Sequence, residues 1–114
     1  MRETATSRAK LESLGAGRFR VSGTLDASTA REVLEQSESR FDQFNELEVD
    51  LGGVAESDSA GLALLIEWLR IARQGSKTIR FANVPAQIEA LARISEVEDL
   101  IGASEKKEKE KKSG

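Results

Sequence analysis

Hydroxyl and carboxylate side chains gather in one short stretch, Ser57, Asp58 and Ser59, directly before an apolar run. Any of the three could cap the helix predicted to follow, because their oxygens accept hydrogen bonds from the first backbone N–H groups of a helix. The positive end of the helix dipole lies there too, so an exposed Ser59 could bind an anion or be phosphorylated. A phosphate would add about −1.5 to −2 charges beside Asp58 and Glu56 and would oppose docking of a partner. The stretch therefore offers either a plain cap or a regulatory hydroxyl.

The amino-acid composition excludes many classes of enzyme. The 114 residues include no His and no Cys, which removes imidazole and thiolate chemistry, the usual zinc and haem ligands, and disulfides. Ser59 has no histidine to act as its base, so we expect no catalytic residues, no metal and no cofactor. A net charge of −3 and an aromatic content of 4% argue against nucleic acid as a partner.

The same sequence indicates one cytoplasmic domain with two charged or irregular ends. No apolar run approaches the roughly 20 residues that span a bilayer, and the N-terminus lacks the apolar segment of a signal peptide. We expect residues 1–8 to be disordered, residues 9–102 to form the domain, and residues 103–114 to be a disordered charged tail. Five Lys and three Glu fill residues 105–112, so a solvated tail is the simplest interpretation and weak attraction to anionic lipid headgroups the alternative.

Apolar periodicity predicts the elements that position the Ser57–Ser59 stretch. Residues 9–14 and 18–22 alternate around Gly15-Ala16-Gly17, which is typical of a hairpin. A helix should begin within residues 26–29, with Thr29 and Glu32 as a capping box. Its buried stripe is predicted to comprise Ala30, Val33, Leu34, Ser37, Phe41 and Phe44.

The second half of the domain alternates strands and helices. Leu47, Val49 and Leu51 predict a strand that breaks at Gly52-Gly53. A helix over residues 60–72, a strand over 78–81, and a helix opened by Pro85 with Asn83 as its cap should follow. Helical crossovers make the later strands parallel, so the fold class is α/β, with a mixed sheet of about four strands and helices packed against it.

The helix over residues 60–72 is apolar on two opposite faces. One face comprises Leu62, Leu65, Ile66, Leu69 and Ala72, and the other comprises Leu64, Trp68 and Ile71. The sheet can cover the first face. The second face is covered either by neighbouring helices or by a partner, and Trp is a favoured residue in a docking patch.

The stretch from Val49 to Leu62, with the pattern V-D-L-x-G-V-x-x-x-D-S-A-G-L, resembles the STAS domain family shared by anti-sigma-factor antagonists and sulfate-transporter tails. Together with the Leu-rich helix over residues 61–73 and the segment over residues 83–93, it is most similar to the MlaB-like branch of that family. The resemblance covers about residues 9 to 101 and implies a STAS-like fold.

The same resemblance implies a function for the helix start. In the MlaB-like branch the domain docks on the ATPase subunit (MlaF-like) of an ABC transporter that moves phospholipid between bacterial membranes, in complex with a membrane permease. The chain would then lie in the cytoplasm, peripheral to the inner membrane, without inserting into it. The residues expected to meet the ATPase are Ser57, Asp58, Ser59, Ala60, Gly61, Leu64, Trp68 and Ile71.

A second function is open at the same site. In the antagonist branch of the family, the serine that matches Ser59 is phosphorylated by an anti-sigma kinase, which makes a phosphorylation-switched antagonist the alternative. Ala60 stands where many antagonists carry a second hydroxyl, so this sequence departs from that pattern.

Overall fold

The computed structural model describes residues 9–102 as an α/β domain of four strands and three helices. The segments 1–8 and 103–114, for which disorder was predicted, lie outside the described residues. The elements follow the predicted order of strand, strand, helix, strand, helix, strand and helix. Their bounds are β1 Ala9–Gly15, β2 Arg18–Leu25, α2 Ala27–Phe41, β3 Glu46–Ser57, α3 Ser59–Gln74, β4 Thr78–Ala82 and α4 Ala86–Ile94.

The strands form one mixed sheet in the order β1-β2-β3-β4. The hairpin partners β1 and β2 are antiparallel, whereas β2 with β3 and β3 with β4 are parallel, as helical crossovers require. Parallel strands end at the same edge of a sheet, so the last residues of β2 and β3 meet, with Leu25 paired to Ser57. The starts of α2 and α3 therefore lie next to each other.

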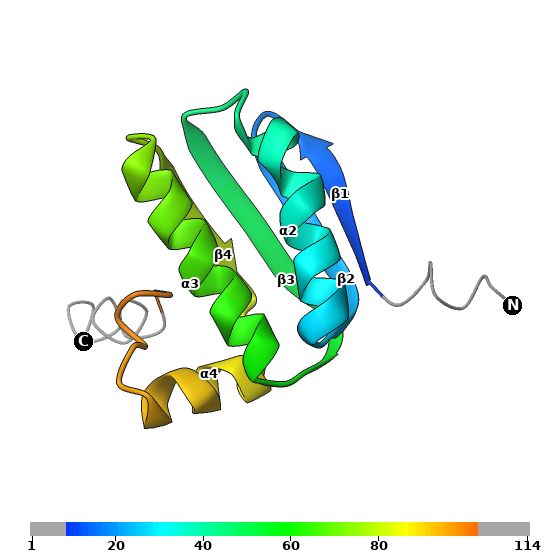
Figure 1. Ribbon diagram of the computed structural model, residues 1–114, viewed down its shortest axis with the longest axis vertical. Helices are drawn as coiled ribbons and strands as arrows, with labels where there is room; N and C mark the ends of the chain where they lie inside the picture. The colour runs from blue at the N-terminus through cyan, green and yellow to red at the C-terminus, as the bar shows by residue number, and fades with distance from the viewer. Residues whose placement is uncertain (1–8, 103–114) are drawn as a thin grey trace, which may run out of the picture.

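Only one face of the sheet carries the core. Figure 1 shows α2 and α3 lying side by side in front of the strands, with α4 across the end where α3 begins. The inward side chains are apolar, and the residues that face the helices are Leu11, Phe19, Val21, Leu47, Val49, Leu51, Ile79 and Phe81. The opposite face carries alternating charges, which include Lys10, Glu12, Arg18, Arg20, Glu48 and Arg80. This division is the period-two pattern of a sheet covered on one side.

The start of α2 differs from the prediction. Asp26 is the N-cap, its carboxylate accepts from the backbone of Ser28 and Thr29, and the Thr29 hydroxyl accepts from the Asp26 backbone at 2.9 Å. The capping box is thus formed by Asp26 and Thr29, and the predicted Thr29–Glu32 box is wrong. Asp at this position caps as well as Ser, and the side chain of Thr29 is already committed inside the first turn.

The end of β3 also differs, because the strand does not break at Gly52-Gly53 but continues to Ser57. A register shift against β2, between Asp50 and Gly53, accommodates the glycines, and a second shift follows between Val54 and Glu56. At Gly53 a Cβ atom would lie 2.8 Å from the Cβ of Ser22, so the missing side chain allows the two strands to approach. The glycine pair marks a close approach within a strand rather than a loop.

Helix α4 begins one residue later than predicted. Pro85 is the N-cap, with no side-chain hydrogen bond to the helix, so the prediction of Asn83 as cap is wrong. Asn83 adopts a positive φ of 55° and donates its amide to Asp50 at 3.0 Å. Asn tolerates this left-handed conformation better than most residues, which explains its place at the turn.

Candidate functional site

The start of α3 is held by Asp58, and this leaves Ser59 available. The backbone N–H of Asp58 donates to the carbonyl of Leu25 at 3.2 Å, and its carboxylate accepts from the N–H of Ala60 at 2.8 Å. Ser59 is the first helical residue and is exposed. No hydrogen bond of its hydroxyl is found within the described part of the chain, whereas the next two N–H groups, those of Ala60 and Gly61, both donate to Asp58.

Gly61 allows the end of β3, the start of α3 and the start of α4 to pack closely together, and we call this junction the corner. A Cβ atom at Gly61 would overlap the hydroxyl of Ser57 and would lie 3.1 Å from the Cδ1 atom of Ile88. The Ser57 hydroxyl donates to the Asp58 carbonyl at 3.0 Å, and the Ser57 N–H donates to the Gln87 side chain at 3.0 Å. Strand β3, helix α3 and helix α4 are thus tied together at the end of the sheet. Ser57 and Gly61 therefore contribute to packing within the domain, and they position the start of α3 on which Ser59 lies.

Sequence reasoning missed Gln87 as part of this corner. A polar residue at the start of a short helix gives no signal of a partner 30 positions away. Gly61 did carry a signal, because a glycine inside a helix costs about 1 kcal/mol relative to alanine and indicates a close approach.

Asp50 forms a second polar cluster in the middle of β3, beside the last residue of β4. Its carboxylate accepts from the Asn83 amide at 3.0 Å, from the Gly52 N–H at 2.8 Å and from Arg20 at 3.4 Å. The Asn83 hydrogen bond, followed by the Gly52 bond, holds the pKa of Asp50 below its ordinary value. The cluster therefore fastens the turn before α4 to β3.

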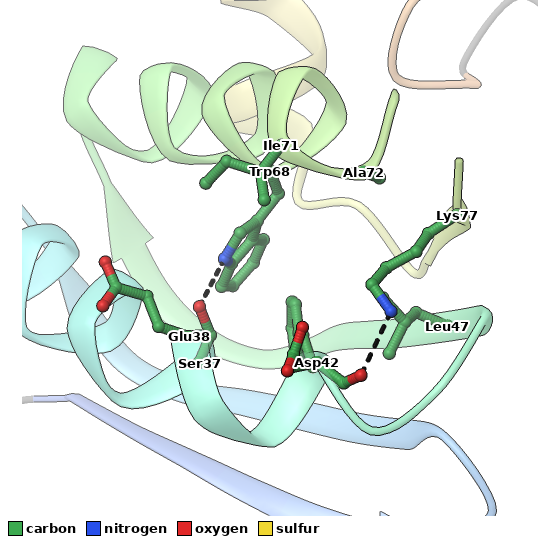
Figure 2. Close-up of a pocket in the computed structure, with 9 residues that line it drawn as sticks. Ser37, Glu38, Asp42, Leu47, Trp68, Ile71, Ala72 and Lys77 are labelled. Atoms are coloured by element: carbon green, nitrogen blue, oxygen red, sulfur yellow. Dashed lines mark hydrogen bonds between the residues drawn. The ribbon is translucent and has the colours of Figure 1, made fainter. Parts of the chain in front are cut away.

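Trp68 and Leu64 do not form the exposed patch that the two-faced helix left open. Trp68 is 1% exposed and Leu64 is 3% exposed, and of the three residues on that face only Ile71, at 37%, reaches solvent. Figure 2 shows Trp68 pointing from α3 toward Ser37 on α2, where its Nε1 donates to the serine hydroxyl at 2.9 Å. The ring also packs against Phe41 and Phe81, with centroids 5.3 and 6.4 Å away. The expectation that Trp68 and Leu64 are available to a partner is wrong, because α2 covers them.

The solvent side of α3 is instead a narrow stripe of small and charged residues. We name this surface the α3 stripe: Ser59, Ala63, Glu67 and Arg70, spaced three or four residues apart. Ala60, Ile66 and Ile71 flank it, half-buried or just exposed. Arg70 forms an ion pair with Glu67, and this hydrogen-bonded contact lowers the pKa of the Glu67 carboxyl. The start of the stripe is small and uncharged, and its far half is charged.

A small cavity lies at the other end of the helix pair. It measures about 60 Å³ and is bounded by Ser37, Trp68, Ile71 and Lys77 among others (Figure 2). Lys77, one of the lining residues, is held in place because its ammonium group donates to the carbonyls of Asp42 and Phe44. Binding pockets for small molecules measure roughly 300 to 1,000 Å³, so this cavity is of the size that holds water.

The described residues contain no cluster of acidic side chains suited to a metal ion. None of their helices has the length and apolar character needed to cross a bilayer.

Comparison with known proteins assigns the fold. Residues 10–102 match the family described as "Mlab, STAS domain", and the chain therefore belongs to the STAS domain family. STAS domains are in general non-catalytic regulatory domains. No curated protein is significantly similar in sequence.

Solved structures agree on the architecture. The anti-sigma factor antagonist SpoIIAA, in its unphosphorylated form, superposes with a TM-score of 0.64 at 14% identity, over 81% of this chain and 84% of SpoIIAA. The crystal structure of Mglu superposes with a TM-score of 0.54 at 20% identity, over 69% of this chain. This chain covers 20% of the length of Mglu. At these identities the likeness concerns the fold alone.

Proposed function

We propose that this protein is a non-catalytic subunit that binds the ATPase of an Mla-type ABC transporter and regulates or stabilises it. Such a transporter moves phospholipid between bacterial membranes and maintains outer-membrane lipid asymmetry. The MlaB label of the matched family supports the proposal. The structural observation that carries it is the exposed start of α3, with the unbonded hydroxyl of Ser59. The chain would lie on the cytoplasmic side, held at the inner membrane by the ATPase and permease.

The geometry of the α3 stripe suits docking of a protein backbone. Ser59, Ala60 and Ala63 are small, so a partner can approach the first two turns of the helix closely. The Ser59 hydroxyl can donate to a carbonyl or carboxylate oxygen of the partner. Ile66 and Ile71 add apolar area on either side, while the Glu67–Arg70 pair would lie at a polar rim. This surface replaces the one centred on Trp68.

The test is co-purification of the ATPase subunit with variants of the stripe. We expect Ala63→Glu and Ser59→Glu to lower the recovered ATPase by at least about tenfold, because an unpaired charge enclosed in an interface is costly. Neither variant should unfold the domain, because both positions are exposed and an acid in the first turn is favoured by the helix dipole. Ser39→Glu, an exposed serine near the end of α2, is the matched control and should retain the ATPase.

Wild-type recovery of the ATPase by both stripe variants would show that this surface is wrong. Trp68→Asp is unsuitable for this purpose, since it places a charge in the core and tests folding.

The exposure of Ser59 also favours one second candidate, a phosphorylation-switched anti-sigma-factor antagonist. The hydroxyl is accessible to a kinase, and the fold resembles that of SpoIIAA. Incubation with a cognate kinase followed by phosphopeptide mass spectrometry tests it. Labelling of Ser59 would support the antagonist, and an unmodified Ser59 would remove it.

A further inference from the structure

The two edges of the sheet are protected differently. Edge strand β1 has a register shift between Ser13 and Gly15, which discourages pairing with another strand. Edge strand β4, with the sequence TIRFA, pairs with β3 without any shift and contains neither Pro nor Gly. An unshifted edge of this kind is a template for another strand.

The free hydrogen-bonding groups of β4 belong to Ile79 and Phe81. The Thr78 N–H donates to the Asn45 carbonyl at 2.9 Å, so Thr78 and, two residues on, Arg80 direct their backbone groups toward β3. Successive residues of a strand alternate, and Ile79 and Phe81 therefore direct N–H and C=O away from the sheet. Among the described residues no backbone group pairs with them.

A groove of about 550 Å³ runs along this edge. All of residues 78–83 line one side, and residues 99–102, at the end of the orange segment in Figure 1, line the other. The apolar part of its lining comprises the half-buried Ile79 and Phe81 together with Leu100, which is 44% exposed, and Asp99 is an acidic residue of the same lining. On the open side Arg80 is exposed, with Glu48 opposite it in register.

We propose that β4 is a docking edge for an extended segment of a partner protein with an apolar–acidic–apolar sequence. The segment adds to the sheet as a fifth strand, with its backbone paired to Ile79 and Phe81. Its acidic side chain lies on the open face beside Arg80, and its apolar side chains enter the groove toward Leu100. The main-chain hydrogen bonds provide affinity, and the alternate side chains of the segment provide specificity.

Arg80 also argues against a second copy of this chain as the occupant. An antiparallel pairing of two β4 strands that uses both Ile79 and Phe81 in each copy places Ile79 opposite Phe81. It then places Arg80 directly opposite Arg80 of the other copy. Like charges directly opposite across two strands are destabilising, whereas an acidic residue at that place is stabilising. Charge complementarity therefore favours a foreign acidic strand.

The test uses the full-length chain and a fluorescein-labelled, end-capped peptide of sequence Thr-Val-Glu-Val-Thr, measured by fluorescence anisotropy. We expect saturable binding, and we expect Arg80→Glu to weaken it about fivefold and to favour Thr-Val-Lys-Val-Thr instead. Arg18→Glu is the matched control, because Arg18 lies on the same open face and is also in register with Glu48, but on an inner strand. It should leave both affinities unchanged.

A backbone variant tests the pairing itself. Ile79→Pro removes one outward N–H and leaves the ladder to β3 intact, as proline allows on an edge strand. We expect it to abolish peptide binding, with circular dichroism confirming that the variant is folded. Amide exchange at Ile79 and Phe81 in the free chain should be fast, and saturating peptide should slow it.

Three results would overturn the proposal. One is the absence of binding up to about 1 mM peptide, an affinity of roughly 4 kcal/mol or less. Another is equal affinity of unmodified chain for the Glu and Lys peptides. The third is slow exchange at Ile79 and Phe81 before peptide is added. Slow exchange that persists on dilution would mean that the chain covers its own edge, and slow exchange lost on dilution would mean that a second copy does.

Discussion

The buried hydrogen bond between Trp68 and Ser37 should be detectable as a coupling energy between helices α2 and α3. Ser37 is 2% exposed, accepts from the indole Nε1 at 2.9 Å and donates to the Leu34 carbonyl at 2.7 Å. In Ser37→Ala the indole N–H loses its partner inside the core. An unpaired buried donor costs about 1 to 3 kcal/mol, while the better helix propensity of Ala returns a few tenths. We expect a net loss of about 1.5 kcal/mol in the free energy of unfolding.

The matched variant removes the donor instead of the acceptor. Trp68→Phe keeps an aromatic ring against Phe41 and leaves the Ser37 hydroxyl bonded to Leu34, so its cost comes from lost volume. Once the indole N–H is absent, Ser37→Ala leaves nothing unpaired. The serine substitution should therefore cost about 1 kcal/mol less in the Trp68→Phe background than in the natural one, and this difference is the coupling energy.

Urea unfolding followed by circular dichroism measures the cycle, because Trp68 is the only tryptophan and fluorescence is lost in half of the variants. A coupling energy below about 0.3 kcal/mol would refute the reasoning, since independent sites add within that margin. It would indicate that water entering from the adjacent cavity of about 60 Å³ satisfies the indole. The folded fraction of each variant should still recover the ATPase, because Trp68 lies inside the domain and not on the α3 stripe.

Two further predictions concern the start of α3 and the Asp50–Asn83 hydrogen bond. Gly61→Ala should destabilise the domain by about 1 to 3 kcal/mol through overpacking, and Ser57→Ala, which removes the hydroxyl that the new Cβ would overlap, should recover part of that loss in thermal unfolding. The pKa of Asp50 is lower in the folded than in the unfolded chain, so its contribution to stability is complete above the unfolded value of about 3.9 and is lost as pH falls through the folded value. Asn83→Ala removes the hydrogen bond that is the largest cause of the lowered Asp50 pKa. The free energy of unfolding should therefore fall less between about pH 5 and pH 2 in this variant. An unchanged dependence of the unfolding free energy on pH would contradict the role given to Asn83.

Periodicity was sufficient to predict the element order, the hairpin, the crossovers and the helix-covered sheet. Strict alternation at Leu47, Val49 and Leu51 and the apolar stripe at Ala30, Val33 and Phe41 each follow from burial of one face, and burial is what periodicity records. The structure confirms these elements, and the family match confirms the STAS resemblance.

Errors arose where a contact between distant segments decides the structure. Gly52-Gly53 is locally typical of a turn, yet Gly53 is small because Ser22 of the neighbouring strand lies against it. Asn83 is locally typical of a helix cap, yet its amide is used by Asp50, 33 positions away. Rules based on neighbouring residues in the sequence assign each residue its most frequent local role. They fail where a contact with a residue distant in the sequence determines the structure instead.

The apolar character of α3 on both faces needs no partner, because three elements cover the helix. The sheet lies beneath it, α2 packs along one flank and α4 packs across the end where α3 begins, and this arrangement buries Leu62, Leu64, Leu65 and Trp68 together. One side of α3 stays open, and that side is the stripe of Ser59, Ala63, Glu67 and Arg70. An all-round apolar helix therefore indicates a helix covered by several elements of its own domain, and the proposed docking surface must be sought among the residues that interrupt the apolar pattern.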